Sequence, residues 1–149
     1  MPTIRFDVKG SEQLKRNLGR LSGRERKKAQ QDGLEAGARV VETHIKLLLS
    51  KPGSGRLYIR GNVAHRASQP GEPPAVDTGF LRNSIVVDEP VTPELATISA
   101  GAEYAEYLEF GTTKMAARPY MRPAIDQNEG EILNAVEKTV AAFVNSVKA

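Results

Sequence analysis

The chain has 149 residues, 40% hydrophobic and 26% charged, a composition that fits one globular domain over residues 1–149 and excludes overall disorder. It contains no cysteine, which excludes a disulfide framework, a cysteine zinc site and a thiol nucleophile. The net charge of +3 divides unevenly, because residues 1–82 carry 16 Lys and Arg against 8 Asp and Glu, whereas residues 83–149 carry 5 against 10.

This asymmetry gives the first part of the chain a charge of +8 and the second part −5. Such a division suits attraction of nucleic acid by the basic part, or a head-to-tail meeting of copies. The alternative is that the charges are scattered over a solvated surface. The chain has neither a signal-peptide stretch at its start nor the ~18 consecutive apolar residues of a membrane span, so we expect a soluble protein with no membrane partner.

Two short elements are predicted at the N-terminus. Apolar and charged residues alternate over residues 3–9, which predicts a half-buried strand with Ile4, Phe6 and Val8 on one face. Ser11 is a typical N-cap for a short helix that ends near residues 22–23. The apolar stripe of this helix consists of Leu14, Leu18 and Leu21.

A long helix is predicted from Arg24 to about Ser50, because apolar residues recur there at spacings of 4 and 3. Gly33 and Gly37 lie within it, each costing about 1 kcal/mol relative to alanine, so we expect close packing or a bend. The helix opens on a basic cluster at the end where the dipole disfavours positive charge. This cluster consists of Arg24, Arg26, Lys27 and Lys28.

Residues 51–76 are predicted to form a long loop or an extended hairpin arm, since prolines and glycines punctuate them throughout. A loop of this length is uncommon in a compact domain, and it is typical of an interaction arm or a mobile segment. Residues 57–59 are apolar enough for a strand of such an arm. Its candidate assembly residues are Lys51, Arg56, Tyr58, Arg60 and Arg66.

The second part of the chain predicts a helical turn over residues 79–82, capped by residues 77–78, and an antiparallel hairpin formed by residues 84–88 and 95–100. Residues 104–111 hold two tyrosines and a phenylalanine, and we expect most of the aromatic core there. A terminal helix with one continuous apolar face is predicted to dock on the sheet. This face consists of Ile125, Ile132, Val136, Val140, Phe143 and Val147.

Catalytic, metal and cofactor sites are not predicted. His44 and His65 lie on different elements without metal-ligand spacing, and a Ser68, His65 and Asp77 triad would lack a nucleophile elbow. The glycines at 53 and 55 lack the rest of any phosphate-binding fingerprint. The chain is therefore interpreted as a non-enzyme without cofactors.

Three carboxylates recur at helical intervals at Glu103, Glu106 and Glu109, and ion pairing is a better interpretation than glycoside hydrolysis. Glu109 stands out because Leu108 and Phe110 flank it. If it is buried, we expect a cationic partner. The candidates are Arg82, Arg118 and Arg122.

Nucleic-acid binding is the second hypothesis. It rests on the basic cluster at residues 24–28 and on the arginines of the arm, with Tyr58 as a stacking ring. Neither a recognition-helix module nor an aromatic platform accompanies them. Basic loops also line passages through which DNA slides without sequence preference.

Four ordered motifs resemble the tail-completion or neck proteins of long-tailed bacteriophages and prophages, also described as minor tail components or head-tail joining proteins. They are Pro-Gly-x-Pro-Pro at 70–74, Thr-Gly-x-Leu-Arg-x-Ser-Ile at 78–85, Tyr-Ala-x-Tyr-Leu-Glu-Phe-Gly-Thr at 104–112 and Arg-Pro-Tyr-Met-Arg-Pro-Ala at 118–124. With the elements before them, the resemblance covers nearly the whole chain.

The resemblance implies an α+β fold in which a small antiparallel sheet packs against a long central helix and a C-terminal helix. It also implies a structural virion protein, made in the cytoplasm of the bacterial host, that forms a ring at the head-tail interface. The shared residues are interpreted mostly as fold determinants, and Phe80 departs from the polar residue expected there. They are Thr78, Gly79, Leu81, Arg82, Ser84, Tyr104, Glu109, Phe110, Gly111, Arg118, Pro119 and Pro123.

The ring hypothesis and the charge asymmetry lead to one expectation about assembly. The basic half of one copy is expected to meet the acidic half of the next, with six-fold symmetry favoured, or to line the lumen against passing DNA. The arm at residues 51–76 is expected to be mobile in the free protein and to order on a neighbouring ring of the neck or tail. A tail-terminator role is a further alternative.

Overall fold

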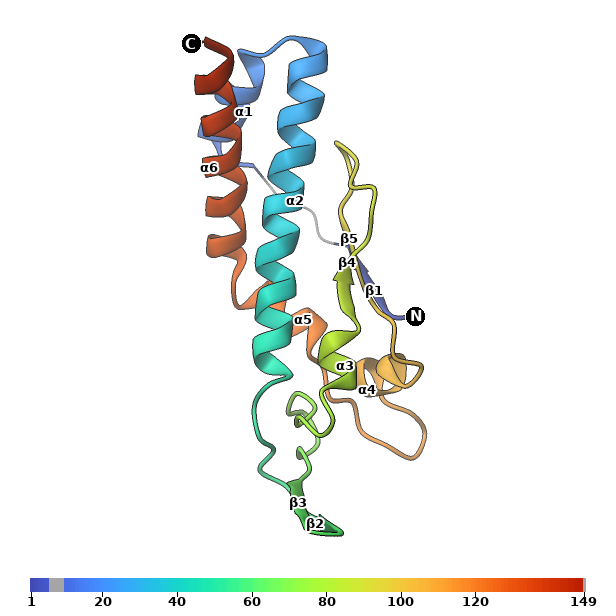
Figure 1. The fold of residues 1–149 in the computed structure, drawn as a ribbon. Helices are drawn as coiled ribbons and strands as arrows, with labels where there is room; N and C mark the ends of the chain where they lie inside the picture. The colour runs from blue at the N-terminus through green and yellow to red at the C-terminus, as the bar shows by residue number, and fades with distance from the viewer. Residues whose placement is uncertain (6–9, 149) are drawn as a thin grey trace.

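The long helix α2 (Gly23–Leu48) lies between a helical layer and a small sheet (Figure 1). The computed structural model describes residues 1–5 and 10–148, and its α+β architecture confirms the predicted fold class. The outer part of the strand predicted over residues 3–9, with Phe6 and Val8, lies outside the described residues.

The sheet has three antiparallel strands in the order β1 (Thr3–Arg5), β5 (Thr97–Ala100) and β4 (Ile85–Val87). The central residue Ile98 pairs with Ile4 on one side and Val87 on the other. The hairpin of β4 and β5 confirms the prediction for residues 84–100. The sheet is the smaller of two layers that cover α2.

The predicted Ser11 cap of the first helix is confirmed, and the second helix begins one residue before the predicted Arg24, after a cap at Ser22 that was not predicted. In α1 (Glu12–Gly19), the hydroxyl of Ser11 accepts a hydrogen bond from the Leu14 N–H at 3.2 Å. In α2, the Glu25 carboxylate reaches back to accept from the Ser22 N–H at 2.8 Å. These caps satisfy N–H groups that a helix leaves unpaired in its first turn.

The C-terminal region corrects two predictions. It forms two helices, α5 (Met121–Asp126) and α6 (Glu129–Lys148), because the chain turns at residues 127–128. Moreover, α6 packs chiefly against α2 and α1 instead of docking on the sheet. The apolar face of α6 lies against α2 where Gly33 and Gly37 leave the α2 backbone without side chains. The buried residues of this face are Ile132, Val136, Val140 and Val144.

The glycines of α2 make this packing close. A Cβ added at Gly33 would lie 3.1 Å from Val140 Cγ2, and one added at Gly37 would lie 2.9 Å from Val136 Cγ2. Neither position has room for a side chain. The expected close packing at Gly33 and Gly37 is therefore confirmed, and it lets α6 approach the α2 backbone.

Two further segments complete the chain. The predicted arm contains a two-stranded hairpin of β2 (Leu57–Arg60) and β3 (Val63–Arg66), which projects beyond the end of α2 (Figure 1). The short helices α3 (Phe80–Asn83) and α4 (Ala105–Phe110) lie at the same end of the molecule. The arm thus extends from the end that carries most of the family-like motifs.

Two clusters of buried apolar residues hold the layers together. One joins α2 to the sheet and to α5, and the other joins α1, α2 and α6. The buried members of these clusters include no residue between Leu49 and Leu81. The arm therefore lies outside the core of the described chain. In that part of the chain, no helix is both long and apolar enough to cross a membrane.

Candidate assembly surface

The Thr-Gly-Phe-Leu-Arg-Asn-Ser segment builds the turn between the arm and β4. Gly79 has a φ of +78°, which favours glycine, and Thr78 Oγ1 accepts from the Phe80 N–H at 3.3 Å as α3 begins. Leu81 is buried. Ser84 donates to the Leu81 carbonyl at 2.8 Å and accepts from the Ala102 N–H at 3.2 Å. These contacts support the interpretation of the segment as a fold determinant.

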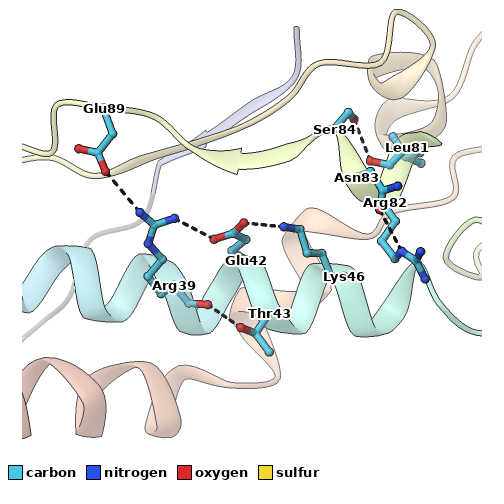
Figure 2. Close-up of polar contacts among 9 residues, drawn as sticks. All are labelled: Arg39, Glu42, Thr43, Lys46, Leu81, Arg82, Asn83, Ser84 and Glu89. Carbon is cyan, nitrogen blue, oxygen red and sulfur yellow. Dashed lines mark hydrogen bonds and ion pairs between the residues drawn. The ribbon is translucent and has the colours of Figure 1, made fainter. Parts of the chain in front are cut away.

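An ion-pair ladder lies on the sheet-facing side of α2 (Figure 2). Arg39 contacts Glu89, from the turn after β4, at 3.4 Å and Glu42 at 3.3 Å. Glu42 also contacts Lys46 at 2.6 Å. This ladder ties the sheet to α2. The i, i+3 and i, i+4 spacing of its members within α2 would have revealed that part of it from the sequence.

Arg82 points from α3 toward the end of α2 rather than toward Glu109. Its Nη1 donates to the Ser50 hydroxyl at 3.4 Å, and its Nε donates to Asn83 Oδ1 at the same distance (Figure 2 shows the latter contact). The long contact with Ser50 fastens the turn weakly to the residues that follow α2.

Glu109 is buried, with 7% of its surface exposed, but its partners differ from the expected ones. Its Oε2 accepts from the Tyr120 N–H at 2.8 Å and the Met121 N–H at 3.0 Å, and its Oε1 accepts from the Arg122 N–H at 3.1 Å. The expectation of a guanidinium partner was wrong. Three backbone N–H groups at the start of α5 satisfy the carboxylate, because a helix leaves those donors unpaired there.

The Arg-Pro-Tyr-Met-Arg-Pro segment completes this junction. The Arg118 N–H donates to the Leu108 carbonyl at 2.7 Å, whereas its buried Nε has no hydrogen-bond partner among the described residues. The Tyr120 side chain is fully buried, and burial, followed by the charge of Glu109, raises the pKa of its hydroxyl. Pro119 precedes the junction, and Pro123 occupies the first turn of α5, as predicted.

The aromatic residues of α4 overturn a second expectation. Phe110 is 70% exposed and Tyr107 is 57% exposed, whereas Tyr120, outside this segment, is buried. The expectation that residues 104–111 supply most of the aromatic core was therefore wrong. Phe80 and Tyr104 are exposed as well, with ring centroids 6.4 Å apart. We call Phe80, Tyr104, Tyr107 and Phe110 the aromatic patch.

Gly111 explains why the chain leaves α4 so sharply. Its φ is +75°, and an added Cβ would lie 2.8 Å from both the Ala117 N and the Met115 O. The following Thr112 N–H donates to the Met115 carbonyl at 2.8 Å. This tight turn confirms that residues 111–112 reverse the chain, and it brings residue 118 back alongside α4.

The base of the arm is closed by hydrogen bonds between the arm's own residues. The Gly55 N–H donates to the Ala67 carbonyl at 2.8 Å, and the Ala67 N–H donates to the Arg56 carbonyl at 3.0 Å. Glu72 accepts from the Ser54 hydroxyl and from the Gln69 N–H at 2.9 Å. The Ser54 hydroxyl, followed by the Gln69 N–H, holds the pKa of the Glu72 carboxyl below its ordinary value.

The basic residues of the arm are partly engaged within the chain. Arg60 pairs with Asp77 at 3.0 Å, and the Arg56 guanidinium lies 5.4 Å from the centre of the Tyr58 ring. Arg66 donates to the Gly55 carbonyl at 3.0 Å, whereas Lys51 is exposed. The proposed stacking ring of Tyr58 thus already carries a cation over it.

In the basic cluster at the start of α2, two residues have partners within the chain and two are exposed without an ion pair among the described residues. Arg26 donates to the Leu18 carbonyl at 3.1 Å and so covers the end of α1, and Lys28 pairs with Asp32 at 2.6 Å. Arg24 and Lys27 are exposed, and among residues 1–5 and 10–148 neither forms an ion pair. This cluster lies at the opposite end of α2 from the arm (Figure 1).

No group of three or more metal-ligating side chains occurs within the described residues. His44 contacts Glu131 at 2.8 Å on the other side of the molecule from the sheet. His65 Nδ1 lies 3.9 Å from Asp77 Oδ1, which is too long for a hydrogen bond, and Asp77 pairs with Arg60 instead. The rejected triad is therefore not assembled.

Comparison with known families gives one match. Residues 12–111 match the family model described as "Bacteriophage HK97-gp10, putative tail-component". A search of the curated proteins and a search of the solved structures each found no match. The matched range runs from α1 to the end of α4, so it includes α2, the arm, the α3 turn and the aromatic patch.

Proposed function

Because the chain belongs to the HK97-gp10-like family of phage tail components, we propose that it is a non-enzymatic structural protein of the virion that joins head and tail by assembling into a ring. The observation that carries this proposal is the family match over residues 12–111. The buried residues of the motifs support this proposal, because they stabilise turns and helix starts inside the chain. The exposed residues of the motifs remain available for contacts with other copies.

The ring is supported by the charge distribution. A ring made of one repeated heterologous contact needs two different faces that fit each other. Residues 1–82 carry a net +8 and residues 83–149 carry −5, so the two parts of the chain attract each other between copies. Copies are therefore proposed to meet basic half to acidic half, with six-fold symmetry favoured.

The neighbours of this ring are proposed to be other proteins of the phage neck and tail. Exposed Arg24 and Lys27 are available to face DNA that passes through the lumen. Free DNA binding is a weaker candidate function, because Arg26, Lys28 and Arg60 already have partners within the chain. A tail-terminator role would use the same kind of ring.

Deletion of residues 54–70 tests the role of the arm in joining. The deletion removes a segment outside both apolar clusters, so the variant should fold with a nearly unchanged melting temperature. In a phage that lacks the native gene, it should yield filled heads and tails that stay separate. Infectious particles at the titre of the native gene would contradict the proposal.

A further inference from the structure

The outer face of the arm is apolar and unpartnered. Leu57 and Ile59 alternate along β2, and their partners across the hairpin are Arg66 and Ala64. The opposite face turns toward the body, because it carries the half-buried His65 and the Arg60 that pairs with Asp77. Ile59 is 74% exposed. We call Leu57, Ile59 and Ala64 the arm face.

The aromatic patch is the second unpartnered apolar surface at the same end of the molecule. Three of its residues recur at intervals of three on and just before α4, so they share one side of that helix. The four aromatic side chains are exposed in the folded chain with the arm included, so the chain's own arm does not cover the patch. Exposed apolar surfaces of this kind mark interaction sites.

The two surfaces carry opposite charges at their margins. Arg66 pairs with Leu57 at the margin of the arm face, and Lys51 lies at the base of the arm. Exposed Glu103 and Glu106 flank the aromatic patch, and neither forms an ion pair within the described residues. An apolar centre with a complementary charged rim is the usual composition of a protein interface.

We infer that the arm face of one copy docks on the aromatic patch of the next copy, an inference that rests on the proposed ring assembly. The occupant is a second copy because one chain carries both complementary surfaces, and a repeated heterologous contact requires such a pair. Arg66 then lies near Glu103 and Glu106 of the neighbouring copy. The arm thereby links copies within the ring instead of reaching a different ring.

Engineered cysteines test this contact, because the native chain has none. Ile59→Cys and Phe110→Cys are introduced together into a phage, and purified particles are oxidised mildly. Disulfides between neighbouring copies should give a ladder of species larger than dimers. Each single variant should give dimers at most, and the pair Leu47→Cys with Val147→Cys, also at exposed positions, should give no ladder.

Serine variants provide a second readout in the same particles. Ile59→Ser and Phe110→Ser should each lower the titre at least tenfold, whereas Leu47→Ser, at a residue that is 55% exposed, should leave it unchanged. Arg66→Glu should lower the titre, and Glu106→Arg should partly restore it in the double variant. Glu94→Arg, at an exposed acid in the turn between β4 and β5, should not restore it.

Two results would overturn the inference while the tail role stands. In the first, the chain is present in particles, yet the 59–110 pair gives no ladder and both serine variants assemble normally. In the second, a photo-crosslinker at position 59 captures a different virion protein. Absence of the chain from purified particles would instead contradict the proposed function itself.

Discussion

The carboxylate of Glu109 joins α4 to α5 by accepting three backbone hydrogen bonds from residues 120–122. It supplies a negative charge where the helix dipole and the unpaired N–H groups favour one. The contact spans more than ten residues of sequence and fixes the turn between them. At the residue scale, this carboxylate links the motif at 104–112 to the motif at 118–124.

Replacement Glu109→Gln is expected to destabilise the protein. The amide retains one acceptor oxygen, so the variant loses the charge and at least one of the three hydrogen bonds. Charge-assisted hydrogen bonds contribute about 2 kcal/mol. The melting temperature should therefore fall by roughly 4–8 °C. Thermal unfolding measured by circular dichroism checks this.

Glu106→Gln is the matched control, because Glu106 is exposed on the same helix. It should leave the melting temperature unchanged. Equal melting temperatures for the native chain and Glu109→Gln, together with unchanged assembly, would contradict the structural role of this carboxylate.

The neighbours of Glu109 could be predicted from the sequence only in part. Flanking Leu108 and Phe110 singled out this acid, and the structure shows that it is buried. The donors could not be predicted, because residues 120–122 approach α4 only through the turn at Gly111, which local patterns do not encode. The same holds for Phe110, whose side chain points to solvent although its residue type favours the core.

At the element scale, the contact between α2 and α6 depends on Gly37. Alanine there would gain about 1 kcal/mol of helix propensity but would place a Cβ 2.9 Å from Val136 Cγ2, and overpacking costs about 2 kcal/mol. Gly37→Ala should therefore lower the free energy of unfolding by about 1 kcal/mol, as measured by urea denaturation.

Gly130→Ala is the control for this prediction. Gly130 lies near the start of α6, and an added Cβ there meets no atom within 4 Å. The substitution should leave stability unchanged or raise it by less than about 1 kcal/mol. A Gly37→Ala variant that gains stability as Gly130→Ala does would show that the helices have room between them.

The base of the arm should respond to acid through Glu72. Its pKa is lowered in the folded chain, so its stabilising contribution is complete above the ordinary pKa and is lost as the pH falls through the folded pKa. The Gln69 N–H signal in an NMR titration should therefore shift below about pH 4.5, the ordinary value. In Glu72→Gln, this shift should be absent. A native signal that stays constant down to pH 2 would contradict the contact.

Most helix and strand boundaries followed from local patterns, whereas the break between α5 and α6 and the assignment of α6 to a layer did not. Ser11 and the leucine spacing located α1, and the proline-separated strand patterns located the hairpin of β4 and β5. The apolar face of α6 indicated that this helix is buried on one side, but not which element covers that side. An apolar stripe on a helix can pack on a sheet or on another helix equally well. Gly33 and Gly37 were the available signal that the partner is α2.

At the scale of the whole molecule, the exposed basic residues form two surfaces that are far apart from each other. The exposed basic residues at the start of α2 and those of the arm lie at opposite ends of the long helix (Figure 1). Exposed Glu103 and Glu106, just before and on α4, lie at the end of the molecule from which the arm projects. The sequence predicted the asymmetry but not this placement, because the placement depends on how the layers stack.

The most direct test of the central claim is the mass of the purified chain, measured by light scattering over a concentration series at low and moderate salt. A parallel run contains a duplex DNA fragment. The proposed ring predicts a discrete closed oligomer whose mass does not change with DNA. A monomer or dimer that coats the DNA, and releases it steeply as salt rises, would contradict the account and make the basic half a nucleic-acid surface.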